Sequence, residues 1–237
     1  MQRRDSPELS SSVGLRPSQG VLSILLVMTG VFLVNAIAHP AFVRDHLALI
    51  PRRALGAEPW QLLSSAFVHL DFGGLFGSAL ALLFFGTPIE RQLGRTRFFQ
   101  LFVSSTILGA LATAGLGRIW APDALFAGAG PAAMGMIAAF GALWGATPIA
   151  LFGIQHMKAS TCAWIFLGIS TAMYLMNYQL YALFGALVGA GMGWLATGNL
   201  TALTDGLRAR REAYKKQRIR RRYKVLSGGR DSRGILN

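Results

Sequence analysis

Six apolar segments constrain the fold of this chain more than any other feature. A helix needs about 20 apolar residues to cross a hydrocarbon core ~30 Å thick. Hydrophobic residues make up 53% of the 237 and charged residues only 14%, which excludes a water-soluble protein of ordinary composition. The six segments span residues 19–38, 61–86, 98–117, 125–147, 159–176 and 178–199.

The composition of these segments favours helices over strands. Gly, Ala and Leu dominate, and the two-residue alternation of a membrane β-barrel is missing. We therefore predict an all-α polytopic membrane protein with a six-transmembrane-helix bundle. We expect a cytoplasmic N-terminal tail over residues 1–18, a membrane domain over residues 19–199 and a basic cytoplasmic C-terminal tail over residues 200–237.

The first apolar segment has an alternative interpretation as a cleaved signal peptide. Ala36 and Ala38 have the small-residue spacing of a cleavage site. The segment is longer than a usual signal core and follows about twenty polar residues, so we favour an uncleaved first helix. Cys162 is the only cysteine, which excludes a disulfide within the chain.

Basic residues are distributed asymmetrically between the two sides of the predicted bundle. With the N-terminus inside, nineteen Lys and Arg residues lie on the cytoplasmic side and four lie outside. Because basic loops stay cytoplasmic during insertion, we predict that both termini are cytoplasmic. This bias, together with absent targeting signals, suits a bacterial inner membrane.

The C-terminal tail carries much of the positive charge. Residues 200–237 contain twelve basic and three acidic residues, so +9 of the net charge of +13 lies there. A basic segment beside a membrane gains ~1 kcal/mol per residue from anionic lipids. We favour an anionic leaflet as its partner over nucleic acid or a ribosome, since no nucleic-acid module accompanies the arginines.

Four motifs occur in order between residues 58 and 195. They are Trp60–Asp71, similar to W-R-L-x-T-x-x-F-x-H-x-D; Gly86–Phe98, similar to G-x-x-x-E-x-x-x-G-x-x-x-F; Gly128–Gly135, similar to G-x-S-G-x-x-x-G; and Tyr181–Gly189, which falls where A-H-x-G-G-x-x-x-G is expected. Together they resemble the rhomboid family of intramembrane serine proteases. The resemblance implies a six-helix fold.

The same resemblance implies a catalytic dyad of serine and histidine, in which the histidine takes the proton of the attacking hydroxyl. In this chain the serine position is Gly130 and the histidine position is Ala182. The two positions that supply oxyanion donors in the family are Gly74 and Ser78. Losing one such donor costs ~10²–10³ in rate. We therefore predict no catalytic residues and an inactive member, a pseudoprotease.

Other polar residues of the predicted bundle have structural interpretations. His69 and Asp71 lie in the second segment, and with Ser78 they form a candidate pocket or serve packing and hydrogen bonding. We expect Glu90 to brace the turn at the end of the second segment, either by satisfying backbone groups or by pairing with nearby arginines. No metal site or cofactor is predicted, because the four histidines are scattered without carboxylates or cysteines at ligand spacing.

Glycines at four-residue spacing predict close helix packing. The stripes are Gly185, Gly189 and Gly193; Gly73 and Gly77; and Gly141 and Gly145. They predict that the second, fourth and sixth helices form a tight core. Further structural positions predicted from the motifs are Gly86, Gly94, Gly128 and Gly135.

Three functions remain open at this point. We favour a non-proteolytic binder or adaptor of transmembrane clients, because the framework is intact around an emptied dyad. The alternative is an intramembrane serine endopeptidase with non-standard catalytic residues such as Ser78. A small transporter ranks last, because the sequence shows neither an inverted repeat nor a ring of charges.

Overall fold

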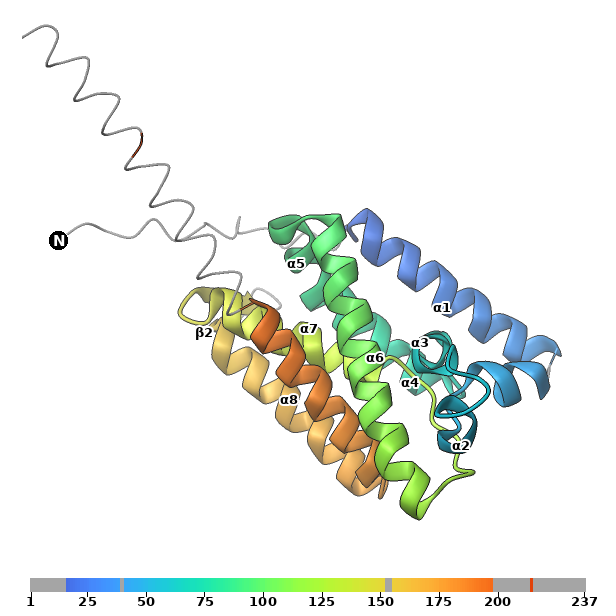
Figure 1. Cartoon of the computed structure of the whole chain (residues 1–237). Coiled ribbons are helices and arrows are strands. Elements are labelled where there is room, and N and C mark those ends of the chain that lie inside the picture. The colour runs from blue at the N-terminus through green and yellow to red at the C-terminus, as the bar shows by residue number, and fades with distance from the viewer. Residues whose placement is uncertain (1–15, 39–40, 152–154, 198–213, 215–237) are drawn as a thin grey trace, which may run out of the picture. The chain divides into compact units, whose positions relative to one another are not determined.

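The computed structural model describes residues 16–38, 41–151, 155–197 and Tyr214 (Figure 1). The chain divides into two compact units, Met1–Thr197 and Gly198–Asn237, and the first unit contains the fold described below. The predictions for the tails at residues 1–15 and for the basic residues after 200 lie outside the described residues.

The first unit is a bundle of helices with one short hairpin. Its elements in order are α1 (Gln19–Ala38), a π-helical turn (Val43–Leu47), α2 (Pro51–Ala54), α3 (Gln61–Ser64), a 3₁₀ turn (Ser65–Phe67), α4 (Phe72–Ala81), a π-helical segment (Leu82–Gly86), α5 (Thr87–Leu93), α6 (Arg95–Trp120), α7 (Gly130–Trp144), β1 (Pro148–Leu151), β2 (Gln155–Lys158), α8 (Ala159–Met176) and a last helix (Leu180–Thr197).

Five of the described helices are long and apolar enough to cross a membrane: Gln19–Ile37, Phe72–Leu93, Arg95–Trp120, Ala159–Met176 and Leu180–Thr197. The helical class of the prediction is confirmed. The count of six spanning helices is not, because α7 has 15 residues instead of the 23 predicted for residues 125–147. The long second helix begins at Phe72 and not at residue 61, since the chain breaks its helical path after Phe67.

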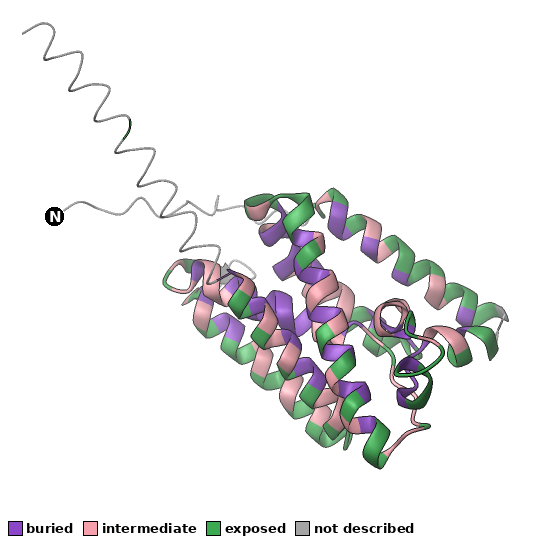
Figure 2. Cartoon of the chain, in the orientation of Figure 1, coloured by how far each residue is buried: buried purple, intermediate pink, exposed green. Residues whose placement is uncertain are grey.

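The short helix α7 forms the centre of the bundle. Residues 132–140 are all buried, and α7 packs against α4, α6 and α8. Figure 2 shows the exposed residues on the outward faces of α1, α8 and the last helix, which are the faces available to lipid. A helix too short to span the bilayer is thus enclosed by longer helices that do.

Close backbone contacts join α6, α7 and the last helix. A Cβ added at Gly189 would overlap the backbone of Pro131, and one added at Gly193 would overlap the backbone of Gly135. From the first contact to the second, both helices advance by four residues in the same direction, so α7 and the last helix run parallel. Gly109 on α6 completes the group, since a Cβ there would lie 2.6 Å from the carbonyl oxygen of Gly185.

The second helix packs on α7, as predicted for the second and fourth helices, but not through its predicted glycines. Gly77 has nothing within 4 Å of an added Cβ, and a Cβ added at Gly73 would approach only the side chain of Asp71. The close glycine contact with the last helix comes from the third helix, α6. Gly141 packs elsewhere, with an added Cβ lying 2.8 Å from that of Ala163 on α8.

A two-stranded hairpin connects α7 to α8 and was not predicted. β1 and β2 are antiparallel, with Pro148 opposite Lys158 and Leu151 opposite Gln155. The inward-facing backbone groups of the four-residue strands pair with each other just after the helix ends.

Candidate functional site

A polar pair lies where the chain approaches α4. His69 is 2% exposed, and its Nε2 atom lies 3.1 Å from the Oγ atom of Ser78. Gly128, in the loop before α7, lies beside the imidazole ring, with an added Cβ 3.9 Å from Nε2. His69 therefore lies in an irregular segment between helices, which corrects its predicted place inside a spanning helix.

Asp71 has a different role from His69. It is exposed and is the N-cap of α4, and its Oδ1 atom accepts a hydrogen bond of 2.7 Å from the Gly74 amide. A capping aspartate satisfies one of the free amides at the start of a helix. The structure thus brings together His69 and Ser78 from the candidate pocket, while Asp71 and Gly74 form the beginning of α4.

The environment of His69 favours the neutral imidazole. Burial lowers the pKa of His69, and the Phe67 backbone and the charge of Asp71 oppose this more weakly. Among the described residues, Nδ1 has no hydrogen-bond partner of normal geometry. A neutral imidazole could accept the proton of Ser78, but it lacks the third group that orients the base in catalytic triads.

Gly130, the serine position of the family motif, is the first residue of α7. A Cβ added there would overlap the hydroxyl oxygen of Tyr174 from α8 and would lie 3.2 Å from its Cζ atom. Gly128, two residues earlier, has φ +112°, a conformation that side-chain-bearing residues rarely adopt. The phenol of Tyr174 therefore occupies the space that a serine side chain would need.

Ala182, the histidine position, lies in the first turn of the last helix. The preceding Tyr181 ring contacts Phe126 at a centroid distance of 6.3 Å and Trp120 at 6.2 Å. Three residues later, Gly185 packs against Thr113 of α6. Ala182 itself takes part in neither the His69–Ser78 pair nor the contact between Gly130 and Tyr174.

Glu90 on α5 caps the first helix, α1. Its carboxylate accepts hydrogen bonds from the amides of Gly20 at 2.9 Å and Val21 at 3.0 Å, and from the Ser18 hydroxyl at 2.5 Å. The residue is 7% exposed. A negative group at a helix N-terminus satisfies free amides and complements the helix dipole. Of the two predicted roles, Glu90 therefore satisfies backbone groups and does not pair with any of the described arginines, but the sequence did not indicate that these groups belong to α1.

Gln61 was also missed by sequence reasoning. It is fully buried; its Oε1 atom accepts from the Ile50 amide at 2.9 Å, and its Nε2 atom donates to Glu58 at 2.6 Å. These bonds hold the segment between α1 and α3 against the bundle. The available signal was a glutamine at the start of an apolar run, where an amide needs buried partners.

The other predicted structural glycines differ in their surroundings. A Cβ added at Gly86 would lie 3.2 Å from Phe98 and from Val21, and Gly94 forms the turn into α6 with φ +86°. Gly135 packs against Ser105. Within the described ranges, no group of three or more His, Cys, Asp or Glu residues could hold a metal ion.

Helices of membrane-spanning length around a buried short helix define a multi-pass integral membrane protein. A family model described as Rhomboid domain matches residues 56–199, and the chain belongs to the rhomboid family. This match confirms the resemblance that the sequence motifs carried.

Individual relatives share parts of this region. The chain is 30% identical over 146 residues to Rhomboid protein 1, mitochondrial, of Saccharomyces cerevisiae, covering 56% of this chain and 40% of the relative. It is 26% identical over 98 residues to RHOMBOID-like protein 12, mitochondrial, of Arabidopsis thaliana, covering 41% and 29%. It is 26% identical over 105 residues to human Rhomboid-related protein 3, covering 40% and 26%. The chain therefore spans less than half the length of each.

Proposed function

We propose that this rhomboid is a non-proteolytic protein that binds transmembrane segments of other proteins. The contact between Gly130 and Tyr174 carries the proposal: the serine position has no side chain, and a phenol fills the space beside it. Acyl transfer by a serine hydrolase needs a nucleophile and a base in contact, and Gly130 and Ala182 supply neither. Without a nucleophile and a base, the helix bundle keeps a binding role.

Exposed apolar side chains on α4 and α8 provide the surface for a client helix. α4 and α8 both pack on α7, and Phe85 and Phe166 join them at one end with a ring distance of 5.1 Å. At the other end Phe76 and Met173 are exposed. Apolar exposure alone is normal in lipid, so these side chains supply the surface, and the emptied catalytic position at Gly130 carries the proposal.

Crosslinking in proteoliposomes tests the proposal. A photo-reactive amino acid replaces Phe76 on α4 or, as a control, the equally apolar and exposed Leu26 on α1. A synthetic single-span peptide is added as the client. We expect adducts from position 76 and intact, uncleaved peptide throughout. Equal adduct formation from both positions would mean that the peptide meets the protein by random collision in the bilayer, which would contradict the proposal.

The His69–Ser78 hydrogen bond favours a second function, a hydrolase with Ser78 as nucleophile. The 3.1 Å distance is within reach for proton transfer. A fluorophosphonate probe separates the two functions. Labelling that Ser78→Ala abolishes would establish the hydrolase, whereas the proposed binder stays unlabelled.

For the orientation, we propose cytoplasmic termini in a bacterial inner membrane, with the basic tail on an anionic leaflet. The proposal is supported by the nineteen-to-four distribution of basic residues. Reporter fusions after residue 237 and within the segment between α1 and α3 test it. Equal cytoplasmic signals from both fusions would contradict it.

A further inference from the structure

The outward face of α6 contains a hollow that the proposed function does not use. It is shallow and open, with a volume of about 910 Å³. The described residues that line it lie on one stripe of α6, from Arg95 to Leu108. The stripe points away from the core side chains Phe98 and Phe102.

The polarity of the hollow changes along its length. Arg95 lies at the N-terminal end and Gln100 follows just over one turn later. The remainder is mostly apolar, with Val103, Ile107, Leu108 and one hydroxyl, Ser104. A glycerophospholipid presents the same order of chemistry: a phosphate, then ester carbonyls that accept hydrogen bonds, then an acyl chain. Each part of such a lipid would meet a side chain of matching character.

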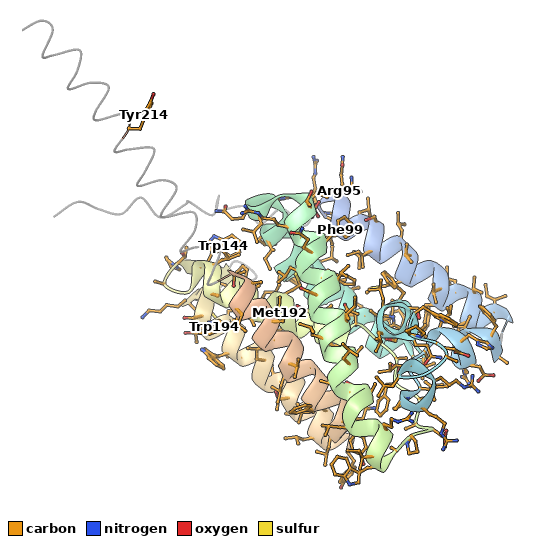
Figure 3. All side chains as sticks on the ribbon, in the orientation of Figure 1. Arg95, Phe99, Trp144, Met192, Trp194 and Tyr214 are labelled. Atoms are coloured by element: carbon orange, nitrogen blue, oxygen red, sulfur yellow. The ribbon has the colours of Figure 1, made fainter. Side chains whose placement is uncertain are left out.

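The Arg95 side chain at the charged end of the hollow contacts an aromatic ring, and no described acidic side chain pairs with it. The Arg95 guanidinium lies 5.7 Å from the centroid of the Phe99 ring, a cation–π distance. Arg16, Arg91 and Arg97 are exposed at the same end of the bundle. Neither ion pair found among the described residues involves these arginines. The end of the hollow is therefore complementary to an anionic headgroup. Figure 3 shows Arg95 and Phe99 together at this end of α6.

The length of the hollow selects a lipid over a protein helix. Thirteen residue steps from Arg95 to Leu108 correspond to about 20 Å of helix. Half of a ~30 Å hydrocarbon core is about 15 Å, so the hollow spans one leaflet and part of its headgroup layer. A client helix would need a groove across both leaflets.

We propose that this hollow is a specific site for one anionic glycerophospholipid, with the phosphate on Arg95 and an acyl chain along Val103 and Ile107. The site differs from the general attraction of a basic tail to a charged membrane. It combines a fixed cation with an apolar channel, so binding requires both parts of the lipid.

Native mass spectrometry of the purified full chain tests the site with phosphatidylglycerol and phosphatidylcholine of identical acyl chains. We expect the wild type to prefer phosphatidylglycerol. Arg95→Ala should reduce that preference about fivefold, the factor that ~1 kcal/mol per basic residue corresponds to. Arg97→Ala is the matched control: it removes the same charge from the same turn but does not line the hollow, and it should leave the preference unchanged.

Two further measurements separate the alternatives. Val103→Trp fills the apolar part and should lower the binding of both lipids, while soluble glycerol phosphate should displace neither. Equal effects of Arg95→Ala and Arg97→Ala would overturn the proposal in favour of diffuse attraction. A photo-reactive residue at position 100 that crosslinks to a polypeptide instead of lipid would overturn it in favour of a protein partner. Unfolding of each variant, followed through Cys162, verifies that the fold is retained.

Discussion

Restoring a serine at Gly130 should destabilise the protein, because Tyr174 already occupies the space. A Cβ at position 130 would overlap the phenol oxygen, and relief requires the Tyr174 side chain or α8 to move. Overpacking a closely packed site costs typically 1–3 kcal/mol. We expect Gly130→Ser to lower the free energy of unfolding by about 2 kcal/mol, within that range.

Removing only the phenol oxygen should relieve most of this cost. In Tyr174→Phe the nearest ring carbon would lie 3.2 Å from the new Cβ, a tight contact that a small shift can relax. The double variant should therefore show a coupling of about 1–2 kcal/mol, as expected for residues in direct contact. Gly115→Ala is the control, since nothing lies within 4 Å of its added Cβ, and it should not destabilise.

The single buried cysteine provides the assay. Cys162 is 1% exposed, so a thiol-reactive fluorophore reports unfolding without any engineered label. The reasoning is refuted if Gly130→Ser unfolds at the wild-type temperature, or if Tyr174→Phe fails to restore it. A further consequence is that Gly130→Ser with Ala182→His should remain inactive against a membrane-embedded peptide while Tyr174 is intact.

Three other predictions use the same unfolding assay. Glu90→Ala should destabilise by about 1–3 kcal/mol for each buried amide of α1 that loses its acceptor. Glu90→Gln should cost less, and equal losses would argue against the cap. Gly189→Ala should lower the free energy of unfolding by about 2–3 kcal/mol, because the new Cβ overlaps the Pro131 backbone. Gly191→Ala has open space around it and should leave stability unchanged. Similar stability of the two variants would contradict the close packing. Burial lowers the pKa of His69, so the unfolded chain binds the proton more readily, and the free energy of unfolding should fall as the pH drops below about 6.5. His69→Asn should flatten the pH dependence of stability in this range. An unchanged slope would show that His69 is not its cause.

The helical class and the family were accessible from the sequence because both depend on local patterns. Apolar runs of membrane length are visible without any tertiary information. The boundaries were less accessible: the run from residue 61 is continuous in hydropathy, but Asp71 caps a new helix after an irregular turn. Hydropathy does not distinguish a helix from an irregular segment that is buried among other helices.

The interior of the candidate site was only partly predictable. The sequence identified Gly130 and Ala182 as positions without catalytic side chains, but Tyr174 carries no motif and lies 44 residues beyond Gly130. Its contact depends on how α8 packs on α7. The capping of α1 by Glu90 is equally long-range, since it joins residues 70 positions apart. The glycine stripes predicted close packing, but periodicity alone could not identify α6 as the partner.

The cap supplied by Glu90 has a consequence for the order of biogenesis. Ribosomes synthesise α1 well before residue 90, so the first helix enters the bilayer while its leading amides still depend on water or lipid headgroups. Docking of that helix must wait until the second spanning helix, which ends in α5 and carries Glu90, has been inserted, and the carboxylate then joins the first segment of the chain to a later one. A nascent chain stalled before this point would hold its first helix in the bilayer without this attachment.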